Sequence, residues 1–207
     1  MSVILFIADL LVYFYYPETA VSKIFLATRE QTPLTWLSAV AILFIALSCS
    51  SNYLRTNEKI WYFLAVIFFF FSMDDAVYFH ERLSGFIADN TNWFASFPTY
   101  IWVILYFPLI IFSLGSLVFL LWKDKKAKNK KLLVIAVIVL GLAVFLDLLD
   151  GYIQKNQVLF FDDSFSRLTF THFIRLSEEM MELYALGCLG YINITRYSLI
   201  KKLKIKN

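Results

Sequence analysis

The segment from Ser72 to Leu83 reads S-M-D-D-A-V-Y-F-H-E-R-L and follows four consecutive phenylalanines at positions 68–71. Two adjacent carboxylates, a histidine and a third carboxylate therefore stand at the far end of a long apolar run. Ionisable residues inside a membrane segment are expensive and usually mark a site with a function. This segment is therefore the first candidate for a functional site.

The composition of the whole chain indicates a membrane protein. Of its 207 residues, 60% are hydrophobic and only 17% are charged, whereas a soluble domain is about half apolar and about a quarter charged. The excess of apolar side chains predicts a lipid environment. The basic residues lie in short loops and a tail with no aromatic platform between them, which argues against nucleic acid as a partner.

Six apolar segments can be counted along the chain, and about 20 residues are needed to span roughly 30 Å of hydrocarbon. The first is short, but it lacks a basic leading region and a cleavage site, so we expect it to be retained as a helix. The predicted fold is all-α: a single polytopic domain over residues 1–207 with six transmembrane helices. The segments cover approximately residues 2–16, 35–54, 60–80, 100–122, 132–152 and 170–195.

Lysine and arginine predict the orientation of these helices. The linker K-D-K-K-A-K-N-K-K at 123–131, the basic tail after residue 195 and the turn with Arg55 and Lys59 all fall on one side of a six-helix chain. The positive-inside rule then places both termini in the cytoplasm, in the inner (cytoplasmic) membrane of the cell. The opposite loops are rich in aromatic residues, which would suit a lipid-soluble substrate. The sequence contains no G-x-x-x-G motif, so it does not indicate an oligomeric state.

Acidic residues of three predicted helices reach similar depths in the outer half of the membrane. At about 1.5 Å per residue, Asp74 and Asp75 lie roughly 21–23 Å along the third helix, and Asp147 lies at a similar height on the fifth. The glutamates of the sixth helix lie roughly 13–20 Å below the outer surface. We therefore expect one shared site. Its candidate metal ligands are Asp74, Asp75, His80, Glu81, Asp147, Asp150, His172, Glu178, Glu179 and Glu182.

Helical spacing assigns these side chains to faces. On the third helix, Asp74, Tyr78 and Glu81 form one stripe, and Tyr78 is expected to donate a hydrogen bond to Asp74. His80 is about 120° from Asp74 around the helix. It can join the site only if the helix loosens there.

The sixth helix carries its own polar stripe. His172, Arg175, Glu179 and Glu182 share one face, and Arg175 is expected to pair with Glu178 or Glu179. Eight carboxylates around one permanent cation cannot all stay ionised without protons or a bound cation.

Three functions remain open from this pattern. The first is binding of a divalent metal such as Fe, Mn, Zn or Ca, because oxygen and imidazole ligands suit these ions. A protein with such a site could be a metal-dependent membrane enzyme. The spacings D-x-x-D at 147–150 and E-x-x-E at 179–182 match no established motif. The second is a proton or cation transporter that uses the acids as a relay. The third is a structural network that fixes helix register.

The same residues resemble a family of uncharacterised bacterial multi-pass inner-membrane proteins. The resemblance rests on S-M-D-D-A-V-Y-F-H-E at 72–81, E-E-M-M-E at 178–182 and T-W-L-S at 35–38. Asp75 replaces a glutamate of the family pattern, which shortens the carboxylate and keeps its charge. The resemblance covers most of the chain and implies a membrane location and a probable site, but no activity.

Overall fold

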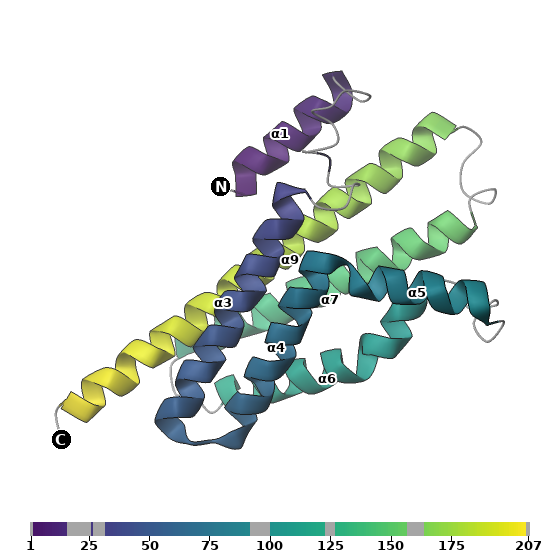
Figure 1. Ribbon diagram of the computed structural model, residues 1–207. Coiled ribbons are helices and arrows are strands. Elements are labelled where there is room, and N and C mark those ends of the chain that lie inside the picture. The colour runs from purple at the N-terminus through teal and green to yellow at the C-terminus, as the bar shows by residue number, and fades with distance from the viewer. Residues whose placement is uncertain are drawn as a thin grey trace.

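The structure is a computed structural model that describes residues 2–15, 26, 32–91, 100–122, 127–156 and 164–205. Every regular element within these residues is an α-helix, which confirms the all-α prediction (Figure 1). The helices are α1 (Ser2–Tyr15), α3 (Pro33–Thr56), α4 (Lys59–Val77), α5 (Phe79–Asn90), α6 (Ile101–Trp122), α7 (Ala127–Lys155) and α9 (Ser164–Ile205).

Local sequence explains where α3 begins and ends. Thr32 caps the first turn with its side chain, and Pro33 occupies a position where its missing N–H costs no hydrogen bond. At the other end Asn57 adopts the left-handed conformation with φ of 56° and donates its N–H to the carbonyl of Tyr53 at 2.8 Å. Asparagine tolerates this conformation better than most residues. The chain therefore turns tightly into α4.

The hydrophobic core joins α3, α4 and α9, with contributions from α6 and α7. Ile45, Cys49 and Trp61 are fully enclosed in it, as is Leu189 of α9. Both cysteines are buried and free, as expected for packing residues. This core occupies the half of the bundle nearest the α3–α4 turn, so it leaves the polar residues at the other half.

Four of the described helices are long and apolar enough to cross a membrane: Pro33–Thr56, Lys59–Val77, Ile101–Phe119 and Lys130–Gln154. The six predicted spans are not all shown. Residues 4–15 form a shorter apolar helix, and α9 carries ionisable residues along its middle. Large apolar side chains such as Phe44, Phe63 and Phe145 point outward, which is the arrangement that lipid favours.

The helices of the bundle do not all pack equally closely. Helix α3 packs closely along α4 and α9, and α7 packs along α9, whereas α6 touches α4, α5 and α7 more sparsely. Figure 1 shows α5 leaving the end of α4 at an angle and crossing toward α6. The arrangement leaves room between α6 and the remaining helices, at the height of the acidic residues.

Candidate functional site

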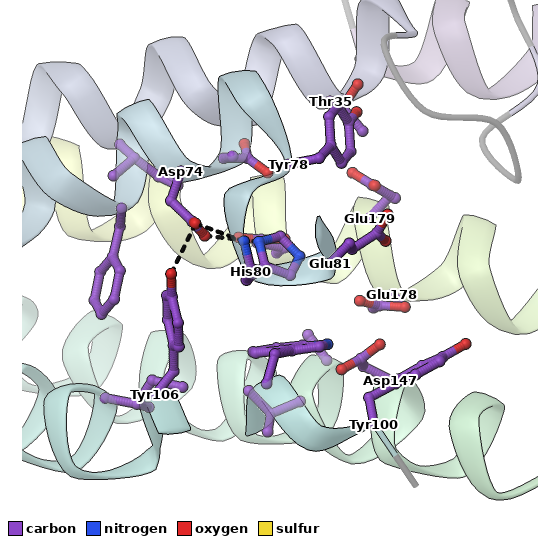
Figure 2. A pocket seen from close by; sticks show the side chains of 18 of the residues that line it. Thr35, Asp74, Tyr78, His80, Glu81, Tyr100, Tyr106, Asp147, Glu178 and Glu179 are labelled. Atoms are coloured by element: carbon purple, nitrogen blue, oxygen red, sulfur yellow. Dashed lines mark hydrogen bonds and ion pairs between the residues drawn. The ribbon is translucent and has the colours of Figure 1, made fainter. Parts of the chain in front are cut away.

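A pocket of about 640 Å³ occupies this space and is lined by α3, α4, α5, α6, α7 and α9. All eight carboxylate residues of the candidate list line the pocket, and so do His80 and Arg175. Figure 2 shows Asp74, Asp147 and Glu179 around it. The lining carboxylates are Asp74, Asp75, Glu81, Asp147, Asp150, Glu178, Glu179 and Glu182.

The segment S-M-D-D-A-V-Y-F-H-E does not form one continuous helix. Helix α4 ends at Val77, Tyr78 adopts the left-handed conformation with φ of 55°, and α5 begins at Phe79. A left-handed conformation costs a residue with a Cβ atom about 1–2 kcal/mol. The predicted stripe of Asp74, Tyr78 and Glu81 is therefore interrupted, because the helical period does not continue through Tyr78.

The break brings His80 to Asp74. Asp74 Oδ1 accepts the backbone N–H of His80 at 2.9 Å, and Asp74 Oδ2 lies 2.7 Å from His80 Nδ1. Asp74 thereby caps the first turn of α5. The hydroxyl of Tyr106 on α6 donates to Asp74 Oδ1 at 2.8 Å, a donor that the sequence did not indicate. Figure 2 shows these three contacts around one buried carboxylate.

His80 is oriented by this contact. A carboxylate that accepts from Nδ1 leaves Nε2 as the other ring nitrogen available to a ligand. The ring lines the pocket and lies within electrostatic range of Asp75, Asp147 and Glu182. Burial by itself would lower the pKa of His80, but the hydrogen bond and charge of Asp74, with other nearby carboxylates, outweigh it and raise that pKa.

A second polar cluster closes the pocket near its rim. Arg175 Nε donates to Asp150 Oδ2 at 2.9 Å, and Tyr100 and Gln154 donate to the same oxygen at 3.0 Å and 2.8 Å. Arg175 therefore contacts Asp150 on α7, a partner that helical spacing did not indicate, and it also lies within electrostatic range of Glu179. Burial and the charge of Asp150 raise the pKa of Tyr100, so its phenol remains a donor.

The remaining carboxylates have unsatisfied oxygens. Four carboxylate oxygens in the pocket lining are shielded from solvent and make no hydrogen bond within the described part of the chain: Asp75 Oδ2, Asp147 Oδ2, Asp150 Oδ1 and Glu179 Oε2. Buried carboxylate oxygens without partners are costly. Figure 2 shows Asp147, Glu178 and Glu179 gathered on the side of the pocket away from Tyr106. Within the described residues, no three His, Cys, Asp or Glu side chains lie close enough together to hold a metal ion as they stand.

His172 lies elsewhere. Its Nε2 is 2.7 Å from Asp9 Oδ2 of α1, and both side chains are only 1% exposed. Tyr13 stacks on the imidazole with ring centroids 4.0 Å apart and donates a hydrogen bond to Thr169. His172 is about ten residues from Glu182, which is about 15 Å along a helix. It therefore holds α1 against α9 and does not line the pocket.

The residues that donate hydrogen bonds to pocket carboxylates from outside the predicted set are Tyr100, Tyr106 and Gln154, and the sequence analysis did not identify them. A signal was present for Tyr106, because it is a polar side chain in the otherwise apolar run I-W-V-I-L-Y-F-P-L-I-I, and a buried acid on a neighbouring helix needs donors. Residues 92–99 and 157–163, which belong to the aromatic loops expected to suit a lipid-soluble substrate, lie outside the described residues.

Comparison with known proteins gives one family. A domain of unknown function (DUF8692) matches residues 3–192. The match includes the three motifs at 35–38, 72–81 and 178–182 on which the resemblance rested. No curated protein and no solved structure matches the chain.

Proposed function

The chain belongs to the DUF8692 family, a domain of unknown function, and from the geometry of its pocket we propose that it is a membrane protein that binds a divalent cation between α4, α5, α7 and α9. The cation would lie beside His80 and draw its oxygen ligands from the carboxylate oxygens that accept no hydrogen bond in the described residues. The protein would lie in the cytoplasmic membrane.

The proposal includes the six-span topology with both termini on the cytoplasmic side. Its support is that Asp9 of α1 and the ionisable residues from His172 to Glu182 of α9 contact neighbouring helices or line the pocket. Asp9 of α1 meets His172, Arg175 meets Asp150, and the glutamates of α9 line the pocket. A helix whose charges are covered by its neighbours can lie in lipid although its own composition is only moderately apolar.

The observation that carries the proposal is the Asp74–His80 contact. A histidine that binds a metal through one nitrogen usually donates its other N–H to a carboxylate, which sets the orientation of the ring. Asp74 provides that carboxylate, with a 2.7 Å contact to Nδ1. Asp75, Asp147 and Glu182, acids of three helices, lie within electrostatic range of the same ring, which supports Nε2 as the proposed ligand atom.

The unsatisfied oxygens provide the rest of the coordination shell. Asp75, Asp147 and Glu179 come from three different helices, and each has a shielded oxygen without a hydrogen bond. A divalent cation would satisfy several of them at once. The carboxylates must close around it, and the glutamates of α9 can do so because their long side chains have three rotatable bonds. Imidazole together with carboxylates favours Mn, Fe or Zn over Ca.

A relay of protons through the whole membrane has less support. On the side of the acids toward the α3–α4 turn, the pocket is lined by apolar residues such as Ile42, Phe68 and Leu186. A relay needs polar groups along its length. A purely structural network has less support too, because such a network is stable when its members are satisfied, and here four oxygens are not.

Metal analysis of the purified protein tests the proposal. Wild-type protein, loaded separately with Mn, Fe, Zn or Ca and desalted in detergent, should retain about one ion per chain of at least one of these metals. His80→Asn and the double variant Glu179→Gln/Glu182→Gln should lose it. Asp89→Asn, which removes an exposed carboxylate of α5, is the matched control and should retain it. Absence of a stoichiometric ion from the wild type under all four loadings would overturn the proposal.

A further inference from the structure

The pocket is larger than a bound cation requires. A water molecule occupies about 30 Å³ of liquid, so an ion with about six ligands of that size fills roughly 200 Å³. The pocket measures about 640 Å³, within the range of roughly 300–1,000 Å³ that small-molecule sites have. More than half of the space is therefore left for a second occupant.

The space left over lies at the apolar end of the pocket. Phe68 is seven residues before Asp75 on α4, and Leu140 is seven residues before Asp147 on α7, so each lies about 10 Å from the acid of its own helix. Leu186 lies about 6 Å beyond Glu182 on α9. All three apolar residues are displaced in the same direction, toward the end of the bundle that holds the hydrophobic core.

The wall of this apolar end is partly built by α6. Its residues Ile110 and Leu114 line the pocket together with Ala143 and Val144 of α7, while α6 as a whole packs sparsely on its neighbours. The outward face of α6 carries exposed apolar side chains such as Phe107 and Ile111. An apolar molecule arriving from the bilayer thus meets a helix that packs only sparsely on α4, α5 and α7.

The charge of the polar end restricts the head group of such a molecule. Eight carboxylates line the pocket, against Arg175 and His80 as the cationic side chains among its lining residues. One divalent ion does not reverse this balance, so an anionic head group would be repelled. A head group with an ammonium would compete with the metal for the same carboxylates. An uncharged polar head group avoids both penalties and can offer an oxygen to the metal.

We propose that the second occupant is a lipid-soluble amphiphile with one apolar chain and an uncharged polar head group, such as an alcohol, ester or amide. Its chain lies along the apolar residues at the inner end of the pocket, and its head group reaches the acid layer beside His80. This inference rests on the proposed cation site, and the following experiment separates the two.

Trp102 provides a reporter, because its ring lines the pocket with its centroid 4.9 Å from that of His80. Quenching of tryptophan fluorescence by a dibrominated octadecyl alcohol is measured in wild type and in Trp102→Phe, and the difference isolates Trp102 from the other tryptophans. Manganese, iron, zinc and calcium contents are measured on the same samples. The same brominated chain with a carboxylate or with an amine in place of the hydroxyl tests the head group.

Two variants test where the apolar chain of the amphiphile lies. Ala143→Phe fills the apolar end, since Ala143 is 4% exposed and lines the pocket. Leu142→Phe adds a ring at the neighbouring, outward-facing position, which is 46% exposed. Ala143→Phe should weaken alcohol binding by roughly tenfold or more, because several methylene groups lose their burial, and it should leave the metal content unchanged. Leu142→Phe should change neither.

Each outcome decides the inference. Saturable quenching of Trp102 by the alcohol, stronger than by the charged analogues and lost in Ala143→Phe, supports it. Absence of saturable quenching in wild type that holds its metal overturns the inference and leaves the cation site intact. Tighter binding of the carboxylate or the amine overturns the head-group assignment. If Ala143→Phe does not fold, the comparison of the three head groups in wild type still decides. A wild type that binds no metal overturns both proposals.

Discussion

Asp74 and His80 lie on opposite sides of a helix break, and the carboxylate of Asp74 holds the first turn of α5 by accepting the backbone N–H and contacting Nδ1 of His80, at 2.9 Å and 2.7 Å. One side chain thus performs two tasks. It caps a helix that begins after a left-handed residue, and it orients an imidazole toward a group of buried acids. The local fold and the proposed site depend on the same contact.

Replacement of Asp74 tests this dependence. Asp74→Asn should lower the affinity for the bound metal by about 10- to 100-fold, the usual effect of losing the carboxylate behind a metal-binding histidine. Tyr106→Phe is the matched control, since it removes only the hydroxyl that donates to Asp74 and should have a much smaller effect. Titration of the metal-free proteins with a competing chelator measures both. Equal affinities in Asp74→Asn and wild type would contradict the orienting role.

Substitutions of Tyr78 test the break itself. Tyr78→Gly and Tyr78→Ala both remove the ring, but only glycine adopts the observed φ of 55° without strain. The glycine variant should therefore be more stable than the alanine variant by about 1 kcal/mol, the reverse of their order inside a helix. Thermal unfolding in detergent measures the difference. An alanine variant as stable as the glycine variant would indicate that the helix runs through position 78.

The pair of Arg175 and Asp150 should show strong coupling. Arg175→Gln leaves the carboxylate of Asp150 buried without its cation, and the side chain of Asp150 is only 3% exposed. The expected loss lies toward the lower end of about 3–5 kcal/mol, because Arg175 is itself partly exposed. The double variant Asp150→Asn/Arg175→Gln should recover much of that loss. A double-mutant cycle on unfolding measures the coupling, and additive effects would argue against the contact.

The stability of the metal-free protein should depend on pH through His80. Its pKa in the folded protein lies above the ordinary value of about 6.5. The contribution of the protonated ring is therefore complete below about pH 6.5 and is lost as the pH rises through the raised pKa. The other ionisable groups facing the imidazole are Asp75, Glu81, Asp147 and Glu182. Unfolding of wild type and His80→Gln should be measured from pH 5 to 9 in chelator, and stability should fall more steeply with pH in the wild type than in the variant.

His172 should prove structural. His172→Gln should leave the metal content unchanged and should weaken the attachment of α1, because Asp9 and Tyr13 lose their partner. Relative to the wild type, the variant should show faster hydrogen exchange in residues 2–15, with little change in α4 or α7. A loss of metal equal to that of His80→Asn would restore His172 to the ligand set expected from helical spacing.

Much of the architecture follows from the sequence alone. The apolar segments predict helices that overlap α1, α3, α4, α6, α7 and α9, although α5 was not predicted and the third predicted helix ends at Val77. The rise per residue places Asp75, Asp147 and Glu179 at overlapping heights on three of them. These quantities belong to single helices. They depend on hydrophobic periodicity and on a rise that varies little between proteins, so they need no knowledge of how the helices pack.

The partners of the acids could not be obtained in this way. The helical period separates His80 from Asp74 by about 120°, and only the left-handed conformation of Tyr78 brings them together. Similarly, the helical period places His172 on the same face as Glu179. Because α1 packs on α9, however, His172 contacts Asp9. The sequence by itself determined a helical protein with long apolar segments and with acids at overlapping heights on three of them. The tertiary structure decided which carboxylate oxygens accept hydrogen bonds and which of the described ones accept none. Helix rotation and the position of a helix break depend on contacts between helices, and the periodicity of a single helix does not contain those contacts.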